Sequence, residues 1–216
     1  MMKRVLVTGG AGYIGAHTCK KLFNAGYIPV TYDNLSTGHK DFVKWGDLIV
    51  GDLQDTKKLT KVLEQYEPFA VIHFAASAYV GESVENPFKY YRNNVGGTLS
   101  LLEAMTNVKL RNLVFSSTCA TYGIPDKNLI DESTIQAPIN PYGRGKLMVE
   151  QILQDLSLSN QISYVALRYF NAAGADRDCE IGESHDPENH LIPLAIRSAW
   201  GDAKLKVFGT DFETSD

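Results

Sequence analysis

The side chains best suited to acid–base chemistry are Tyr142 and Lys146, in the string Tyr142-Gly-Arg-Gly-Lys146. Residues four apart share one face of a helix, so the phenol and the ammonium can be neighbours. A phenol with a pKa of about 10 is a weak base at neutral pH, and a nearby positive charge stabilises its phenolate. The same spacing also occurs on solvated helix faces. The sequence therefore predicts a catalytic pair only together with further site residues.

Thr118 is the third candidate for the chemistry. It follows Ser116 and Ser117 at the end of a short apolar run, where a strand is expected. A hydroxyl at the carboxyl end of a parallel strand is in the right region to hydrogen-bond a reacting alcohol. The alternative is that Thr118 is only a turn residue at the end of the strand.

A glycine-rich turn near the N-terminus is the element expected to hold a cofactor beside these residues. Gly9, Gly12 and Gly15 are spaced GxxGxxG, between an apolar run at 5–7 and a helical pattern at 13–25. Such glycines permit a tight turn, close approach of a pyrophosphate and close packing of helix on strand. The N-terminus of the helix favours an anion. An ordinary glycine-rich turn is the alternative, but the flanking strand and helix favour a dinucleotide site.

Two carboxylates follow later expected strands. Asp33 lies eighteen residues after Gly15, where a carboxylate can accept both adenine-ribose hydroxyls and repel a 2′-phosphate. No arginine stands between Asn34 and Lys40, so NAD is favoured over NADP, although Lys40 itself is close. Asp33 can also be a turn residue before Asn34. Asp52 either meets the adenine edge or is a loop carboxylate, and the sequence leaves both open.

Strands and helices alternate through residue 170. The strands are expected at 5–7, 27–32, 48–50, 70–74, 113–115 and 162–167, and the helices at 13–25, 56–66, 87–105 and 141–156. Asp55 and Asn140 are expected to cap two of these helices. Repeated βαβ units predict an α/β fold with a Rossmann-like, doubly wound parallel sheet and right-handed crossovers.

The polarity and the periodicity of the sequence change after Asn171. Residues 172–189 are polar and weakly periodic, a helix is expected at 190–200, and a short strand at 206–208. We therefore expect an NAD-binding Rossmann domain with the catalytic pair at 1–171, and the start of a smaller substrate-binding lobe at 172–216. So short a lobe would have difficulty burying its own core.

Composition limits the function classes. The 216 residues are 44% hydrophobic with a net charge of −4, which predicts a packed domain and gives no reason to expect nucleic-acid or membrane binding. No apolar run is long enough to span a bilayer, and the N-terminus has the pattern of a strand rather than a signal peptide. Cys19, Cys119 and Cys179 lack metal-ligand spacing, so free thiols in a reducing cytoplasm are expected, and no metal.

Together these residues resemble the extended short-chain dehydrogenase/reductase family and, within it, the branch of UDP-glucose 4-epimerases. Besides the glycine turn and the Thr, Tyr and Lys residues, the resemblance is carried by strings that run through the whole chain: His73-Phe-Ala-Ala, Val80-Gly-Glu-Ser83, Tyr90-Tyr-Arg-Asn-Asn94, Lys146-Leu-Met-Val-Glu-Gln151, Arg168-Tyr-Phe-Asn-Ala-Ala-Gly174, His190-Leu-Ile-Pro193 and Val207-Phe-Gly209.

The resemblance implies site residues position by position. Beyond the three glycines, it implies NAD contacts from Tyr13, Ile14, Asp33, Asn34, Leu35, Ser36, Thr37, Gly38, Asp52, Leu53, Phe74, Ala75, Ala76, Asn93, Tyr142, Lys146 and Phe170. It implies contacts to a UDP-sugar from Thr118, Asn171, His190, Leu191 and Phe208. It further implies a cytoplasmic homodimer that pairs through the helices at 87–105 and 141–156.

The implied activity is the NAD-dependent interconversion of UDP-glucose and UDP-galactose through a 4-keto intermediate, as in galactose metabolism. Cys119 and Ala120 follow Thr118 where related dehydratases carry acidic residues, which disfavours dehydration. Ala78 stands where some members have a lysine, and His190 where some have asparagine.

The family's chain continues past Phe208 and there supplies an arginine clamp and most of the sugar pocket, so the resemblance implies that this chain lacks the C-terminal part. The alternatives are an epimerase or reductase for another nucleotide sugar, and a truncated, inactive NAD-binding module.

Overall fold

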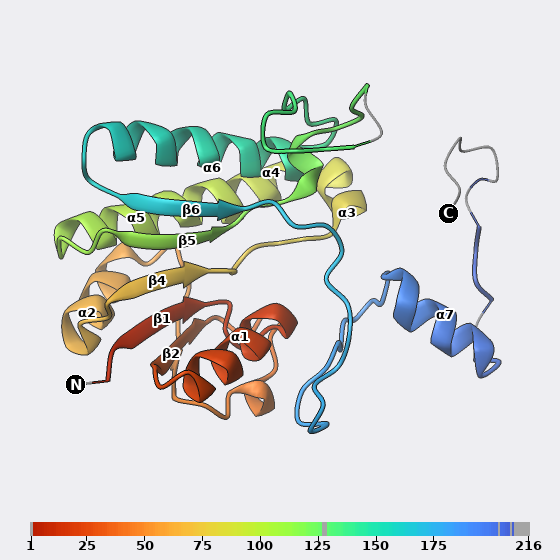
Figure 1. The fold of residues 1–216 in the computed structure, drawn as a ribbon, viewed down its shortest axis with the longest axis horizontal. Coiled ribbons are helices and arrows are strands. Elements are labelled where there is room, and N and C mark those ends of the chain that lie inside the picture. The colour runs from red at the N-terminus through yellow and green to blue at the C-terminus, as the bar shows by residue number, and fades with distance from the viewer. Residues whose placement is uncertain (1, 127–128, 203, 208, 210–216) are drawn as a thin grey trace. The chain divides into compact units, whose positions relative to one another are not determined.

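A parallel sheet of six strands is the centre of the fold. The computed structural model describes residues 2–126, 129–202, 204–207 and 209 (Figure 1). The strand order is β3-β2-β1-β4-β5-β6, and every neighbouring pair is parallel. This is the order of a doubly wound dinucleotide-binding sheet, with the reversal between β1 and β4. The predicted fold class is confirmed. The strands are β1 Arg4–Thr8, β2 Ile28–Asp33, β3 Asp47–Val50, β4 Ala70–His73, β5 Asn112–Ser116 and β6 Ser163–Leu167.

The helices follow the strands much as the sequence predicts. Asp55 caps one of them by accepting a hydrogen bond from the Lys58 N–H at 3.0 Å. Asn140 caps another by accepting from the Gly143 N–H at 2.8 Å. The helices are α1 Tyr13–Asn24, α2 Thr56–Tyr66, α3 Val80–Glu85, α4 Pro87–Tyr90, α5 Gly97–Asn107, α6 Pro141–Leu158 and α7 Leu191–Ala199, with short 3₁₀ turns η1 Lys40–Phe42 and η3 Cys119–Thr121.

The expected helix over 87–105, weakened at Gly96 and Gly97, is helical throughout. Its middle is the π-helical segment η2 (Tyr91–Gly96), which lies between α4 and α5. The Asn94 side chain there accepts from the Ser77 N–H at 2.8 Å and donates to the Ser77 carbonyl at 2.9 Å. π-Helical turns are often found at functional sites. Here the turn ties the helix to the segment after β4.

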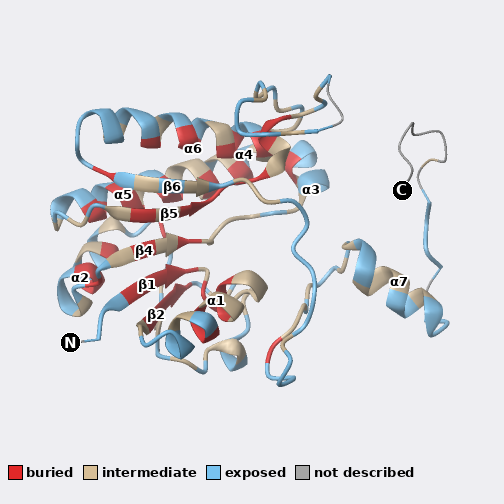
Figure 2. Ribbon diagram, viewed as in Figure 1, coloured by how far each residue is buried: buried red, intermediate tan, exposed pale blue. Residues whose placement is uncertain are grey.

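The two faces of the sheet have separate cores, because successive side chains of a strand point to opposite faces. Leu6 belongs to the larger core, which it forms with buried residues of α2, α5 and α6. Val5 and Val7 belong to a smaller core with Cys19 of α1. Figure 1 shows α1 on the opposite side of the strands from α5 and α6. Figure 2 shows the buried positions concentrated along β1, β2 and β5.

The chain divides into two compact units, 1–172 and 173–216. In the second unit, α7 has no buried residue, and Leu191 and Trp200 at its ends are largely exposed (Figure 2). The strand expected at 206–208 does not form in the described residues Lys206 and Val207, since no described strand pairs with them. Phe208 lies outside the described residues.

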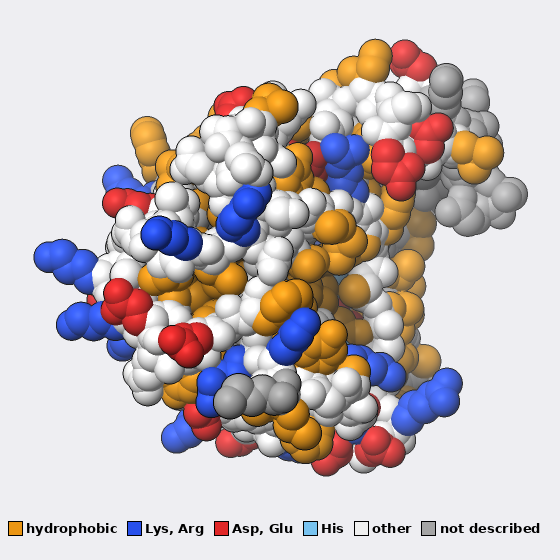
Figure 3. Space-filling view, turned by 60° about the vertical axis from the view of Figure 1, so that its left-hand side comes forward, with side chains coloured by type: hydrophobic (Ala, Val, Ile, Leu, Met, Phe, Trp, Pro, Cys, Tyr) orange, Lys and Arg blue, Asp and Glu red, His pale blue; other side chains and the backbone are white. Residues whose placement is uncertain are grey.

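On the face seen in Figure 3, Lys and Arg side chains are interspersed with Asp and Glu among hydrophobic groups. Among the described residues, no helix has the length and apolarity to cross a bilayer. All three cysteines are free.

Candidate active site

The glycine turn after β1 is packed so tightly that larger residues cannot replace two of its glycines. Gly9 has a φ of 72°, and a Cβ atom there would lie 2.6 Å from the backbone nitrogen of Ala75. A Cβ atom on Gly15 would lie 2.1 Å from the carbonyl oxygen of Gly9. Gly12 is the N-cap of α1, without a capping side chain, and the first helical turn carries no acidic residue. This end of the helix therefore fits an anionic pyrophosphate.

Asp33 is held rigidly against this turn. Its Oδ2 accepts from the Ala11 N–H at 3.0 Å, its Oδ1 accepts from the Leu35 N–H at 2.8 Å, and the residue is buried. The bond to Leu35 is the turn interaction that the sequence offered as an alternative. The bond to Ala11 also fixes the carboxylate beside the glycines, so the structure combines both roles.

Asp52 has the contacts of a loop carboxylate. Its Oδ1 accepts from the Gln54 N–H at 2.9 Å, and its Oδ2 accepts from Asn34 Nδ2 at 3.0 Å. Its backbone oxygen accepts from the hydroxyl of Tyr32 at 2.9 Å. The contact of Asp52 with an adenine edge stays a prediction.

Other expected cofactor residues surround the same turn. The N–H groups of Phe74 and Ala75 donate to the Thr8 carbonyl at 2.9 and 3.1 Å. These bonds hold the segment after β4, which includes Ala76, next to the glycine turn. A Cβ atom on Gly38 would lie 3.1 Å from Asp33 Oδ1. The remaining members of the set lie at the start of α1 or in the loop after β2: Tyr13, Ile14, Ser36 and Thr37.

Three further members of the expected set lie apart from the turn. Asn93, a residue of η2, donates through Nδ2 to Ser77 Oγ at 3.3 Å and to Asn94 Oδ1 at 2.9 Å, and so contacts the segment after β4. Leu53 is buried in the core. Phe170 is exposed.

Tyr142 and Lys146 lie in the first two turns of α6, beside the end of β5. Lys146 is almost wholly buried, and its Nζ donates to the Ser116 carbonyl at 2.6 Å. The same Nζ lies 5.9 Å from the centre of the Tyr142 ring. Thr118, the N-cap of η3, is also buried and hydrogen-bonds to the phenol. The structure therefore brings the three expected catalytic residues together.

Burial controls the protonation of this group. It raises the pKa of Tyr142 to about 12, although the hydrogen bond with Thr118 opposes the rise. Burial also lowers the pKa of Lys146 to about 8, against the opposing charge of Glu150. Among the protein's own side chains, desolvation dominates and keeps the phenol above its ordinary pKa. The expectation that Lys146 and a nicotinamide ring together lower this pKa stays a prediction. A further positive charge is needed beside the phenol.

Sequence reasoning missed an ion pair behind Lys146. Arg168 Nη2 lies 2.6 Å from Glu150 Oε2, and Arg168 Nη1 donates to the Tyr122 hydroxyl at 3.0 Å. Ser117 Oγ also donates to Glu150. These bonds connect α6 with the ends of β5 and β6. The available signal was the spacing of Glu150, four residues after Lys146.

His73 was also missed as a structural residue. Its Nδ1 lies 2.6 Å from Thr8 Oγ1 and its Nε2 lies 2.9 Å from Thr98 Oγ1, so the ring connects β4 with β1 and α5. Burial, with a contribution from the Lys146 charge, lowers its pKa to about 3. His73 is therefore a neutral core histidine, next to the site but fully engaged in hydrogen bonds.

The expected sugar contacts are distributed over both units. Thr118 and the exposed Asn171 belong to unit 1–172, whereas His190 and Leu191 belong to unit 173–216. Phe208 is outside the described residues. Their roles toward a substrate stay predictions.

Comparison with known proteins gives a consistent picture. Residues 5–214 match the NAD dependent epimerase/dehydratase family. A UDP-glucose 4-epimerase of Rhizobium meliloti (strain 1021) is 57% identical over 213 residues, which are 98% of this chain and 65% of that protein. A crystal structure of UDP-glucose 4-epimerase from Brucella ovis in complex with NAD is 59% identical with a TM-score of 0.97, over 99% of this chain and 66% of that one.

A third relative was crystallised with a sugar nucleotide. The UDP-glucose-4-epimerase of Stenotrophomonas maltophila, with bound NAD and formylated UDP-arabinopyranose, is 36% identical with a TM-score of 0.95. The match covers 100% of this chain and 67% of that one. The chain thus spans about two thirds of the length of the relatives that it matches.

Proposed function

The chain belongs to the NAD dependent epimerase/dehydratase family, and we propose that it binds NAD and interconverts UDP-glucose and UDP-galactose by epimerisation at C4 of the sugar. The observation that carries the proposal is the convergence of Thr118, Tyr142 and Lys146 at the carboxyl end of β5. The glycine turn after β1 supplies the second component, a cradle that accepts a pyrophosphate.

The residues of unit 1–172 fit NAD. The α1 N-terminus lacks a capping side chain, and the tight contacts of Gly9 and Gly15 leave only backbone there. The buried carboxylate of Asp33 favours ribose hydroxyls over a 2′-phosphate, which supports NAD rather than NADP. The other expected contacts named above are part of this proposal.

When bound, NAD supplies a hydride acceptor and donor for the sugar C4 and a positive charge on its nicotinamide ring. Tyr142 takes the proton of the sugar 4-hydroxyl as a phenolate, and Thr118 hydrogen-bonds that oxygen. Lys146 supplies a buried positive charge 5.9 Å from the phenol ring. The 4-keto sugar then presents its other face, and Tyr142 returns the proton to the inverted alcohol.

The balance of charge favours proton abstraction only in the complex with cofactor. The protein's own side chains hold the pKa of Tyr142 at about 12. The pKa of Tyr142 would fall if the site held a cationic nicotinamide ring near the phenol, since an opposite charge favours the ionised form. Base catalysis is therefore tied to the oxidised cofactor. Tight retention of NAD follows from the same logic, because its release in mid-cycle would leave the keto sugar unreduced.

The test is a coupled assay of the purified chain that follows conversion of UDP-galactose to UDP-glucose. Tyr142→Phe removes the proposed base, and Tyr164→Phe, a tyrosine of β6, is the matched control. We expect turnover in the control and none in Tyr142→Phe, with NAD content equal in both. Equal turnover in the two variants contradicts the proposed base. A folded, NAD-loaded chain without turnover assigns the activity to a longer chain.

An epimerase or reductase for another nucleotide sugar is the second candidate, because the residues that bind the sugar are only partly described. The same assay with UDP-N-acetylgalactosamine in place of UDP-galactose separates the two. A module that binds NAD without catalysis is the third candidate, and it predicts retained NAD with no affinity for UDP-sugars.

We also propose a cytoplasmic homodimer that pairs through α4, α5 and α6. Exposed apolar side chains on these helices support it: Phe88, Leu99, Met148 and Leu158. A gel-filtration mass of one subunit would contradict the dimer. The proposed domains are an NAD-binding unit at 1–171 and a partial substrate-binding lobe at 172–216.

A further inference from the structure

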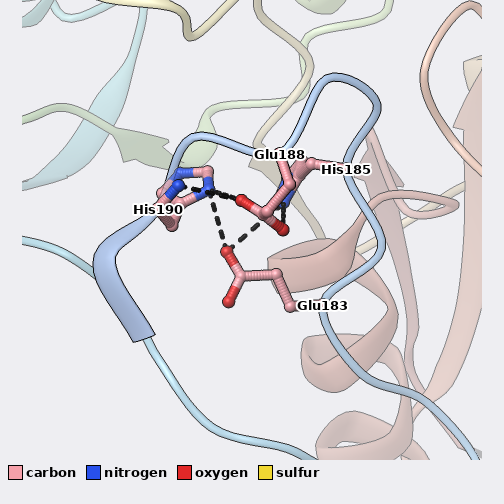
Figure 4. Close-up of side chains that lie close together, drawn as sticks. All are labelled: Glu183, His185, Glu188 and His190. Atoms are coloured by element: carbon pink, nitrogen blue, oxygen red, sulfur yellow. Dashed lines mark hydrogen bonds and ion pairs between the residues drawn. The ribbon is translucent and has the colours of Figure 1, made fainter. Parts of the chain in front are cut away.

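Four ligand-type side chains converge in the segment that precedes α7. They are Glu183, His185, Glu188 and His190, and one oxygen or nitrogen of each lies within 4.8 Å of those of the others (Figure 4). Nδ1 of His190 lies 2.9 Å from Glu183 Oε1 and 2.8 Å from Glu188 Oε1. Nδ1 of His185 lies 3.3 Å from Glu183 Oε1 and 3.8 Å from Glu188 Oε2. Both imidazoles therefore direct the same ring nitrogen at the same two carboxylates.

Glu183 Oε1 is the atom that points to a ligand. The Glu183 side chain is only 9% exposed, and Oε1 is buried without a hydrogen-bond partner among the described residues. A buried carboxylate oxygen in this condition is destabilising unless something else neutralises it. It lies between two imidazole nitrogens, at the centre of the group.

Glu188 is fixed in place by backbone donors. Its Oε1 accepts from the N–H groups of Asn189 and His190 at 2.8 and 2.9 Å. Two carboxylates, one of them buried and the other fixed by backbone donors, thus face two imidazoles.

The two rings lie close to each other as well as to the carboxylates. The centroids of the His185 and His190 rings are only 4.6 Å apart. One divalent cation in this group would balance the charge of both carboxylates and be bound by both rings. It also uses the lone pairs of all four ligand atoms at once.

The spacing suits a tetrahedral ion. Metal–ligand bonds of about 2.0–2.2 Å place tetrahedral ligand atoms about 3.3–3.6 Å from one another. The four imidazole–carboxylate separations above run from 2.8 to 3.8 Å and bracket that range, with Glu188 presenting a different oxygen to each ring. All four ligand atoms of the group lie within 4.8 Å of one another. Imidazole with carboxylate, in the absence of a thiolate, is a donor set suited to zinc and its neighbours rather than to calcium.

We propose that Glu183, His185, Glu188 and His190 form a four-ligand site for a divalent transition-metal ion, with zinc as the expected occupant. The site lies within unit 173–216 and does not depend on the proposed enzymatic activity. Because it joins four positions of one loop, the ion fixes the entry into α7, which begins at Leu191.

The site also gives His190 a defined tautomer. Binding of the metal through Nδ1 leaves the proton on Nε2, which then is a fixed hydrogen-bond donor. A donor of this kind suits an anionic diphosphate, which is part of the UDP-sugar that His190 is expected to contact. This step rests on the proposed function, and the metal site does not.

The experiment is zinc titration of the purified, chelator-treated chain in competition with a chromogenic chelator, followed by cobalt substitution. We expect one zinc per chain and a visible cobalt spectrum of tetrahedral type. Glu183→Gln keeps the shape of the side chain but removes its charge, and His185→Asn removes a second ligand. Each is expected to weaken zinc binding by about tenfold or more, since even outer-shell changes reach that size.

Two matched controls come from the same unit. Glu180→Gln alters the neighbouring exposed acidic group of Asp176, Asp178 and Glu180, and Cys179→Ser removes its thiol. Both are expected to bind zinc like the parent chain. The proposal is overturned by a parent chain that binds no zinc, by equal affinity in Glu183→Gln, or by loss of binding in Cys179→Ser. Tighter binding of calcium than of zinc also overturns it.

Discussion

The ammonium of Lys146 has a predictable effect on the titration of Tyr142. Its Nζ lies 5.9 Å from the centre of the phenol ring, so with an effective dielectric constant of about 20 it stabilises the phenolate by about 2.8 kcal/mol, or about 2 pKa units. Since burial lowers the pKa of Lys146 to about 8, the ammonium is present and stabilises the phenolate only below that pH. There Lys146→Met should lower the phenolate fraction of Tyr142 about 100-fold.

The assay is ultraviolet absorption of tyrosinate as a function of pH, with excess NAD present. The chain has 11 tyrosines, so the signal of Tyr142 is isolated by subtracting the titration of a Tyr142→Phe chain prepared in the same way. The subtraction is done separately in the parent and in the Lys146→Met background. The measured quantity is the ratio of Tyr142 tyrosinate absorption in the two backgrounds below pH 8, where Lys146 carries its charge.

Lys20→Met is the control for the loss of a buried lysine, since Lys20 is also buried and lies over the ring of Trp45. It should leave the Tyr142 tyrosinate absorption below pH 8 unchanged. If Lys146→Met also leaves it unchanged, the ammonium does not stabilise the phenolate, and Lys146 acts only through its bond to the Ser116 carbonyl.

Three further results are expected. Gly15→Ala should abolish NAD retention and lower the unfolding free energy, because its Cβ would lie 2.1 Å from the Gly9 oxygen, whereas Gly81→Ala, with no heavy atom within 4 Å, should retain NAD. As the pH is lowered from 6.5 to about 3, the unfolding free energy measured in urea should fall by up to about 5 kcal/mol, because only the unfolded chain protonates His73 in this range. His73→Gln should flatten this pH dependence. Between pH 8 and 10.5 the unfolded chain retains the Lys146 proton that the folded chain loses, so the parent should gain stability relative to Lys146→Met, measured by the same unfolding curves.

The sheet and most helices could be predicted because their signals are local. The boundaries of α2 follow from a periodic apolar pattern and the Asp55 cap, and the structure begins that helix at Thr56 as expected. The π-helical segment η2 could not be predicted in this way. It depends on hydrogen bonds between Asn94 and Ser77, which are far apart in the sequence and meet only in the folded chain.

The same distinction between local and long-range signals applies to the candidate active site. The spacing of Tyr142 and Lys146 on one helix is enough to predict their proximity. Their pKa values are not predictable from spacing, because burial depends on the strands and helices packed around them. The sequence also shows glutamate and histidine alternating over residues 183–190. Only the fold shows that Glu183 directs a buried oxygen between two rings.

The division into two units makes the proposals separately testable. The glycine turn, Asp33 and the Tyr142–Lys146 pair all lie within 1–172, so NAD binding and the phenol titration report on that unit. The proposed metal ligands lie within 173–216, together with His190 and Leu191. A chain that binds NAD and shifts Tyr142 but ignores UDP-sugars has an intact first unit and lacks sugar recognition. If restoring zinc then restores UDP-sugar binding, the loop before α7 is the missing element; if it does not, the missing contacts come from elsewhere.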